Sequence, residues 1–320
     1  MNLVYLFPGQ NSRYPEMIAQ LRKLTPLADA ILDAASGILS RNLREHFRPE
    51  NSDMFACNRD VQIGVFLASH ILVKALEAQG IQANASAGLS LGEYSHLVHA
   101  GALRFEDALR LLVARGNAYD RAPQGVMTSV FPCDADQVES VLEGSVDIGI
   151  QLTRRNFVLS GERDAVESAA ARLEDEAYAQ ARVIETRLPM HSRVFRPAAE
   201  EFRSALSEVE WQIPRLTYLS NVDGRPVVSP TKDIFVDRLY RHVFTRVRWS
   251  DCIGTLVDQL PGATFIEVGP KSILHDLFTR EYRNVTALKT DEAGGGFAPF
   301  REIVDALKAL VRHRDGVGAA

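Results

Sequence analysis

The stretch SAGLSLGEYSHLVHAGAL, residues 86–103, places a serine between two glycines and decides how the rest of the fold is interpreted. Small residues precede Ser90, as a strand that ends in a sharp turn requires, and helical periodicity follows Gly92. Strand, turn and helix in this order are typical of a nucleophile elbow. The two glycines let the backbone pass closely, and the N–H groups that open the helix stabilise negative charge.

A second interpretation of this stretch stays open. A GxSxG match alone is weak evidence, because Gly and Ser are so common that roughly one chain in ten of this length carries one by chance. In that case Ser90 sits in a glycine-rich turn and only caps the helix that follows.

A serine nucleophile also needs a base. His191 is the best-placed histidine, because in LPMHSRVFRP (188–197) it follows a strand and precedes a helix, where α/β proteins gather their active-site groups. Its alternative role is to begin or cap that helix. His70, His96 and His99 lie within helical patterns, and a helix can present them in any direction.

Composition excludes several classes of function. The chain has 320 residues, is 46% hydrophobic and carries a net charge of −5, without a basic stripe, so we expect no nucleic-acid partner. Three scattered cysteines without a CxxC motif suit a reducing cytoplasm. We find no metal-ligand constellation and no Walker-type phosphate loop. The opening MNLVYLFPGQ is typical of a buried strand, and no stretch approaches the roughly 18 apolar residues of a membrane span, so we expect no membrane partner.

Strands and helices alternate along most of the chain, which predicts an α/β layer fold. Outside residues 124–188 we expect strands at 3–7, 81–88, 216–220 and 264–269, and helices at 15–24, 26–39, 60–79, 93–103, 105–116, 194–209, 233–243 and 249–260, with a last helix after the glycine-rich loop.

Residues 124–188 show a different order of predicted strands and helices. Their pattern is βαββαβ, the ferredoxin-like unit, with strands at 125–131, 146–152, 156–161 and 179–188 and helices at 134–144 and 163–177. We therefore expect a large subdomain over residues 1–123 and 189–320, and a ferredoxin-like insert over 124–188.

Nine segments that occur in a fixed order carry a resemblance to a known family. They are FPGQ (7–10), GLSLGEYSHLVHAGAL (88–103), ARG (114–116), GVM (125–127), LSG (159–161), PMHSRVFRPA (189–198), NVDG (221–224), VRW (247–249) and EVGPKSIL (267–274). Nearly the whole chain resembles the malonyl-CoA:acyl-carrier-protein transacylase family. The fold that this implies is an α/β-hydrolase-like large subdomain that carries an inserted ferredoxin-like small subdomain.

The resemblance also implies a mechanism. Ser90 attacks the thioester of an acyl-CoA with His191 as general base, and the backbone N–H groups of Gln10 and Leu91 form the oxyanion hole. The phosphopantetheine thiol of an acyl carrier protein then takes the acyl group. Acyl-CoA, with malonyl-CoA favoured, is the substrate, and no cofactor is bound permanently.

Two further positions bear on the acyl group. Arg115 matches the arginine with which the family grips the free carboxylate of malonate, although an arginine near a helix C-terminus also stabilises the helix dipole. Met190 occupies a position that shapes the acyl pocket, where a bulky residue favours a small acyl group.

Departures from the family pattern bear on the substrate. Leu89, in a substrate-binding position, replaces a histidine, and His242 replaces the glutamine whose backbone carbonyl orients the catalytic histidine. Asn11 and Arg13 replace a glycine and a glutamine of the family, and Leu152 lies near the place of a family asparagine. They favour a stand-alone enzyme of polyketide or related secondary metabolism over a housekeeping copy of fatty-acid synthesis.

Two other functions remain open, a hydrolase that removes acyl groups from carriers and a non-catalytic subunit that docks the carrier. Arg115 argues against the hydrolase, and the pair of Ser90 and His191 argues against the subunit. An acidic carrier needs basic residues to dock on, and the candidates are Arg154, Arg193, Arg196 and Lys271. Each of them alone is also explained as a solvated surface charge.

Overall fold

A computed structural model describes residues 2–317, without side-chain detail for 310–317, and divides the chain into two units. The first unit is formed by Met1–Val113, Pro214–Thr217 and Val257–Ala320. The second is formed by Ala114–Ile213 and Tyr218–Leu256. The large subdomain and insert predicted from the sequence stay a prediction.

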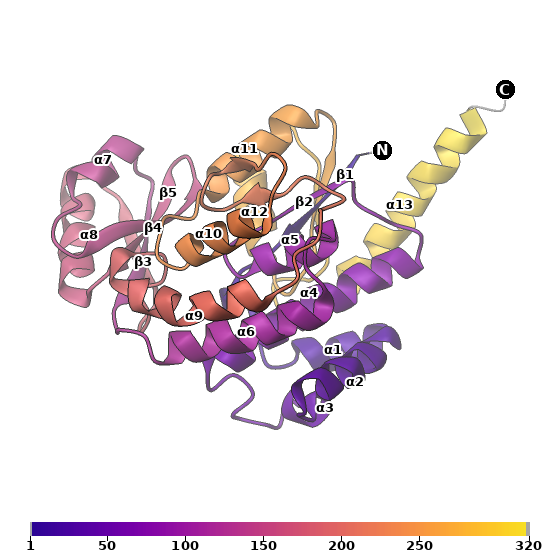
Figure 1. Cartoon of the computed structure of the whole chain (residues 1–320). Coiled ribbons are helices and arrows are strands. Elements are labelled where there is room, and N and C mark those ends of the chain that lie inside the picture. Colours follow the sequence, from indigo (N-terminus) through magenta and orange to yellow (C-terminus); the bar gives the residue numbers. More distant parts are fainter. Residues whose placement is uncertain (1, 318–320) are drawn as a thin grey trace. The chain divides into compact units, whose positions relative to one another are not determined.

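A parallel sheet of four strands forms the centre of the first unit (Figure 1). Its order is β10-β9-β1-β2, with β1 at Leu3–Phe7, β2 at Ala85–Gly88, β9 at Thr264–Glu267 and β10 at Ala287–Lys289. Every residue of β1 is buried, as its unbroken apolar run predicts. Phe7 and Gly88 pair where β1 and β2 end, so the loops that follow these two strands start side by side.

Helices cover the rest of the first unit. They are α1 (Met17–Leu24), α2 (Leu27–Leu39), α3 (Leu43–His46), α4 (Asn58–Ala78), α5 (Gly92–Ala100), α12 (Ile273–Glu281) and α13 (Ala298–Val317), with a 3-10 turn η1 at Gln10–Ser12. Helices α6 (Phe105–Asp120) and α11 (Trp249–Gln259) each contribute residues to both units.

Helix α4 is the core helix of the first unit. It ends before Gly80, which adopts the left-handed φ of +75° expected of a residue just after a helix. By length and composition α4 could also cross a membrane, since its most apolar window has a mean hydropathy of 1.4. The sequence holds no unbroken apolar run of that length, so this property of α4 was not predicted. That window is 78% buried inside the protein, as in the core helix of a folded domain.

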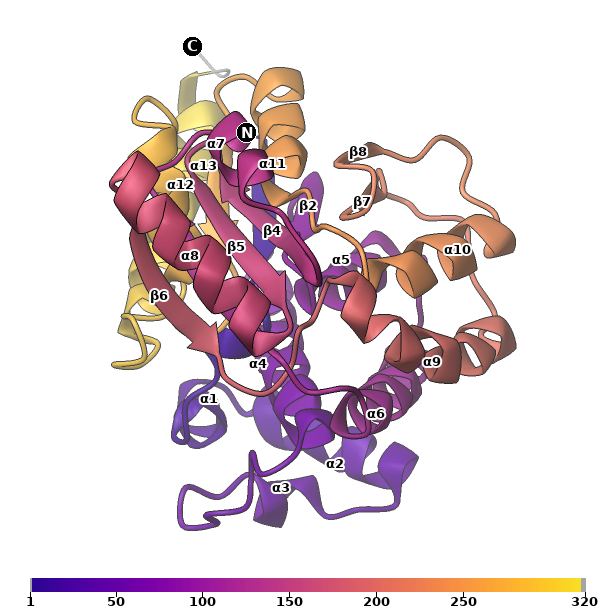
Figure 2. The same ribbon diagram turned by 90° about the vertical axis from the view of Figure 1, so that its left-hand side faces the viewer.

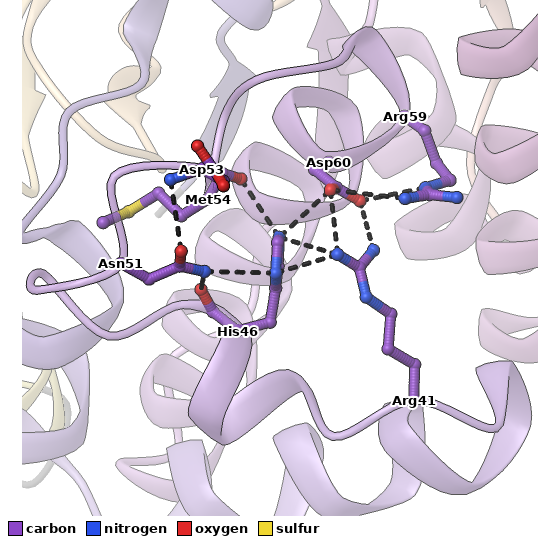
Figure 3. A network of polar contacts seen from close by, with 7 residues as sticks. All are labelled: Arg41, His46, Asn51, Asp53, Met54, Arg59 and Asp60. Atoms are coloured by element: carbon purple, nitrogen blue, oxygen red, sulfur yellow. Dashed lines mark hydrogen bonds and ion pairs between the residues drawn. The ribbon is translucent and has the colours of Figure 1, made fainter.

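A buried ion-pair cluster fixes the N-terminal end of α4 (Figure 3). Asp60 is 3% exposed, and its carboxylate accepts from Arg41 Nη2 and Arg59 Nε at 3.0 Å each. His46 Nε2 lies 3.1 Å from the same carboxylate. Burial alone would raise the pKa of Asp60, but the hydrogen bonds from the two arginines outweigh it and lower the pKa to about 2. The cluster therefore joins α4 to the segment around α3 through one ionised carboxylate.

An antiparallel sheet forms the core of the second unit. Its order is β4-β5-β3-β6, with β3 at Val126–Phe131, β4 at Val146–Thr153, β5 at Asn156–Gly161 and β6 at Gln180–Glu185. Helix α7 (Ala135–Ser140) follows β3 and α8 (Arg163–Ala177) follows β5, so the elements succeed one another as βαββαβ. Figure 2 shows α8 lying across this sheet, and its buried residues join those of the strands in one apolar cluster.

The second unit also contains a helical part. It consists of a 3-10 turn η2 (Arg193–Phe195), α9 (Arg196–Glu208), the short strands β7 (Leu219–Ser220) and β8 (Arg225–Pro226), and α10 (Lys232–His242). An isolated parallel bridge between Ile150 and Val247 joins the segment after α10 to the edge of the antiparallel sheet.

The structure differs from the predicted elements at several places. The helix predicted at 134–144 ends at Ser140, because the N–H groups of Val141 and Leu142 bond three residues back and tighten the last turn. The strand predicted at 216–220 is reduced to Leu219–Ser220, which pairs with β8 around the predicted Asp223-Gly224 turn. Elements α3, α12, β8 and β10 were not predicted; all but α12 are four residues or shorter.

Candidate active site

Ser90 lies in the turn between β2 and α5, in a strained backbone conformation. Its φ is +51°, in the left-handed region that non-glycine residues rarely adopt. The turn is held by hydrogen bonds from Gly92 N to Leu89 O (2.9 Å) and from Glu93 N to Ser90 O (3.0 Å). Such strain amounts to about 1–3 kcal/mol and clusters at functional sites, so the observed outlier favours a functional serine over an ordinary turn residue.

The two glycines that flank Ser90 are sterically required. A Cβ added at Gly88 would lie 1.9 Å from Gly92 O, and one added at Gly92 would lie 2.2 Å from Phe7 O. No side chain fits at either position without moving the backbone. The backbone is therefore closely packed where β1 and β2 end and α5 begins. A nucleophile elbow requires this packing.

The backbone amides of Gln10 and Leu91 lie in the loops that follow β1 and β2, whose ends are adjacent. Gln10 opens the 3-10 turn η1, and Leu91 is the N-cap residue of α5. The first N–H groups of a helix have no acceptor within the helix. A Cβ at Gly9 would lie 3.4 Å from Leu89 O, so the loop of Gln10 lies against the turn of Ser90. Two amides at adjacent strand ends are what an oxyanion hole uses.

Leu89 precedes the serine and continues the strand pairing, because its N–H donates to Phe7 O at 2.9 Å. Its side chain is 7% exposed and lies next to Gly9. An apolar residue here contributes no hydrogen bond or charge to the surroundings of Ser90.

His191 lies in the second unit, between β6 and η2. Its backbone is also left-handed, with φ +63°, and its N–H donates to Val243 O at 3.0 Å. Its Nδ1 lies 2.7 Å from His242 O. Because a carbonyl oxygen can only accept, Nδ1 carries the proton and Nε2 keeps its lone pair. The ring is therefore set in the tautomer that a general base needs.

The His191 imidazole is neutral at physiological pH. Burial first and the charge of Arg115 next lower the pKa of His191 to about 3, although the hydrogen bond to His242 opposes them. The ring of His242 lies 5.1 Å from that of His191 between centroids. Burial, His191 and Arg115 lower the pKa of His242 as well. The neutral imidazole has no proton on Nε2 and can accept one there, while burial and the nearby cation both disfavour its charged form.

Arg115 is the largest fully buried side chain of the described residues, with 0% exposure, and it comes from α6. Its guanidinium carbon lies 4.4 Å from the ring centroid of Tyr119, one helical turn further on. Because its charge lowers the pKa of both His191 and His242, a buried cation accompanies the imidazole within the second unit. A planar guanidinium in such a place suits two-point recognition of a carboxylate.

The backbone of Met190, the residue before His191, is held by the antiparallel sheet. Its carbonyl accepts from Ser160 Oγ of β5 at 2.6 Å, and a Cβ at Gly149 of β4 would lie 3.2 Å from the same oxygen. The side chain of Met190 is 4% exposed. The antiparallel sheet thus anchors the segment that carries the imidazole.

The predicted site residues fall into two sets. The first unit brings together Gln10, Leu89, Ser90 and Leu91. The second unit brings together Arg115, Met190, His191 and His242. Within the described part of the chain, no group of three or more His, Cys, Asp or Glu residues could hold a metal ion.

The model of the acyl transferase domain family matches residues 4–299. The chain belongs to this family. Among curated relatives, the malonyl CoA-acyl carrier protein transacylase of Bacillus subtilis is 28% identical over 91% of this acyltransferase and 93% of its own length. The enzyme of that name from Escherichia coli K12 is also 28% identical, over 90% and 95%.

Solved structures share the α/β fold of this acyltransferase. A malonyl CoA-acyl carrier protein transacylase from Clostridium perfringens superposes with a TM-score of 0.90 at 24% identity, over 98% of this chain and 100% of that one. A malonyl-transacylase in complex with its type II PKS acyl-carrier protein superposes with a TM-score of 0.86 at 25% identity, over 96% and 100%.

The other histidines near Ser90 in sequence have partners of their own. Ser86 Oγ lies 2.8 Å from His96 Nδ1 and 2.9 Å from His99 Nδ1. His70 stacks on Phe105 at 4.4 Å between ring centroids. These contacts occupy the three rings within the helical core of the first unit.

Tyr119 is a functional candidate that the sequence analysis missed. The signal was present, because residues four apart on a helix lie on the same face, and Arg115 and Tyr119 are four apart.

Proposed function

We propose that this acyltransferase moves a malonyl group from coenzyme A to the phosphopantetheine thiol of an acyl carrier protein, by way of an ester on Ser90. The observation that carries the proposal is the buried Arg115 guanidinium that accompanies a neutral, oriented His191 in the second unit. The name shared by the curated relatives supports the same substrates.

In the first half-reaction, Ser90 Oγ attacks the carbonyl carbon of the thioester while His191 Nε2 takes the hydroxyl proton. The carbonyl oxygen becomes an oxyanion, which the N–H groups of Gln10 and Leu91 stabilise. When the tetrahedral intermediate collapses, the C–S bond breaks and the proton on Nε2 passes to the departing thiolate. Coenzyme A leaves, and the malonyl ester remains on Ser90.

The second half-reaction reverses these steps with a different thiol. The phosphopantetheine thiol of the carrier gives its proton to His191 Nε2 and attacks the ester carbonyl. The C–O bond to Ser90 breaks, and Oγ takes the proton back. A thioester is consumed and a thioester is formed, so the residues need only to place the groups, stabilise the oxyanion and exclude water.

Arg115 sets the class of acyl group in this proposal. Its guanidinium binds the free carboxylate of malonyl through two parallel hydrogen bonds. Met190 and Leu89 supply buried apolar surface that restricts the acyl group to a small one.

The carrier is proposed to come from polyketide or related secondary metabolism. The departures at Leu89, Asn11 and Arg13 support this choice, as does the likeness to the malonyl-transacylase in complex with a type II PKS carrier. Transfer rates to a polyketide carrier and to a fatty-acid carrier from the same organism test it. A marked preference for the fatty-acid carrier would reverse the assignment.

Arg196 is a stronger candidate for carrier docking than two of the other predicted residues, Arg193 and Lys271. Arg193 is paired with Asp147 at 2.6 Å, and Lys271 Nζ donates to Asn11 O at 3.0 Å. The exposed Arg196 instead stacks on Phe244, 4.4 Å from the ring centroid, and makes no ion pair with a described residue. Its charge can therefore pair with an acidic residue of a carrier. Arg196→Glu is expected to raise the KM for the carrier and leave ester formation on Ser90 unchanged.

Two measurements separate the proposal from the other functions. If the malonyl ester on Ser90 is lost to water at a rate that added carrier does not change, the protein is a hydrolase. If no ester forms at all, the protein is a docking subunit. Transfer is supported when the ester persists alone and is discharged by holo carrier protein but not by the apo carrier.

A further inference from the structure

Tyr119 carries a buried hydroxyl group that has no hydrogen-bond partner among the described residues. It lies on α6 with 0% exposure. Its ring is enclosed on two sides, by the guanidinium of Arg115 at 4.4 Å and by Phe195, which meets it edge-on at 4.7 Å between centroids. The surroundings therefore fix the ring, and its hydroxyl group stays unsatisfied.

An unsatisfied buried hydroxyl destabilises a fold, and native structures keep few of them. A phenylalanine would fill the same space beside Arg115 and Phe195 without this loss. The hydroxyl is therefore best explained by a partner that arrives from outside the chain.

The neighbouring charge identifies the kind of partner. The ring face of Tyr119 lies against the cation of Arg115, so a ligand that reaches the hydroxyl also meets the guanidinium. A carboxylate has two oxygens that can accept from Arg and from a hydroxyl at the same time. Burial raises the pKa of Tyr119, which keeps the phenol protonated and able to donate at neutral pH.

We propose that Tyr119 is a specificity-determining residue, whose ring orients the Arg115 guanidinium and whose hydroxyl donates a hydrogen bond to the terminal carboxylate of the acyl group. This inference rests on the proposed function. The carboxylate is then held by donors from two successive turns of α6, and an acyl group without a carboxylate leaves the Tyr119 hydroxyl without an acceptor. Tyr119 adds to the discrimination of malonyl against acetyl.

Tyr119→Phe tests this role, because it keeps the ring under Arg115 and removes only the hydroxyl. Loss of a hydrogen bond to a charged group is expected to raise the KM for malonyl-CoA by about 10- to 100-fold. The kcat is expected to stay unchanged, since the carboxylate is remote from the reacting carbonyl. Acetyl-CoA, used as a poor alternative substrate, is expected to react at the same rate with the variant and the wild type.

Tyr5→Phe is a matched control. Tyr5 is also fully buried, but its hydroxyl donates to Ile81 O at 3.2 Å in the first unit. Removal of this hydroxyl is expected to lower the melting temperature and to leave the ratio of malonyl to acetyl transfer unchanged.

The outcomes are distinguishable. If the wild type forms no malonyl ester, the proposed function fails. If the wild type transfers malonyl and Tyr119→Phe has the same KM for malonyl-CoA, or loses malonyl and acetyl transfer equally, the role of Tyr119 is overturned and the proposed function stands. A rise in KM for malonyl-CoA alone supports the role.

Discussion

Replacement of Arg115 by alanine tests the choice of acyl group. The guanidinium is fully buried and its charge acts on His191, so the proposed malonyl carboxylate would be buried with it. Removal of one partner of a buried ion pair costs about 3–5 kcal/mol, because the other charge stays desolvated. At 1.36 kcal/mol for each factor of ten, kcat/KM for malonyl-CoA is expected to fall roughly 150- to 5,000-fold.

The assay compares malonyl-CoA with acetyl-CoA in transfer to a holo carrier protein. Acetyl has no carboxylate, so its kcat/KM is expected to stay constant or to rise in Arg115→Ala. Acetyl transfer also reports on folding, since a misfolded variant loses both activities. A conservative Arg115→Lys variant is expected to recover only part of the malonyl activity, because an ammonium cannot form the two parallel hydrogen bonds.

The pH dependence gives a second measurement on the same variant. The charge of Arg115 lowers the pKa of His191, so its removal is expected to raise that pKa and move the acid limb of acetyl transfer to higher pH. Burial, the larger cause, remains in the variant. This role of Arg115 is refuted if Arg115→Ala lowers malonyl and acetyl transfer by the same factor with no displacement of the acid limb.

Three further predictions concern the framework. Gly92→Ala would place its Cβ 2.2 Å from Phe7 O. We therefore expect the free energy of unfolding to fall by at least about 1–3 kcal/mol and the ester on Ser90 not to form. An unchanged melting temperature together with normal labelling of Ser90 contradicts the elbow packing. Asp60→Asn is expected to lower the free energy of unfolding in urea by about 2 kcal/mol. This is less than for a fully buried ion pair, because the Arg41 side chain is 32% exposed. An unchanged urea midpoint contradicts this prediction. Burial raises the pKa of Glu267 to about 8 against about 4.3 in an unfolded chain, so the unfolded state ionises first and stability falls from pH 4 to pH 8. Glu267→Gln is expected to flatten that fall in melting temperature, and a slope equal to that of the wild type argues against it.

The sequence predicted most of the long elements and the type of fold, because these follow from periodic burial. The strand at 3–7 and the helix before Gly80 were found where apolar spacing and turn chemistry place them. Short elements such as β10, with three residues, have too little pattern to be recognised. They form because a neighbouring strand, here β9, offers its edge.

The sequence predicts a candidate site where a local pattern points to it. Ser90 stands between two glycines, and the close contacts at Gly88 and Gly92 show why this turn requires them. The two features that only packing reveals are the buried charge of Arg115 acting on His191 and the enclosed hydroxyl of Tyr119. A sequence gives residue identity and spacing, but it does not show which polar groups folding deprives of water.

The most direct test of the account is the mass of the intact protein after brief mixing with malonyl-CoA, followed by peptide mapping. We predict a gain of one malonyl group on the peptide that contains Ser90, absent in Ser90→Ala, formed far more slowly in His191→Ala and removed by holo carrier protein. No gain in the wild type, or the same gain in Ser90→Ala, would contradict the assignment of Ser90 as the residue that carries the acyl group.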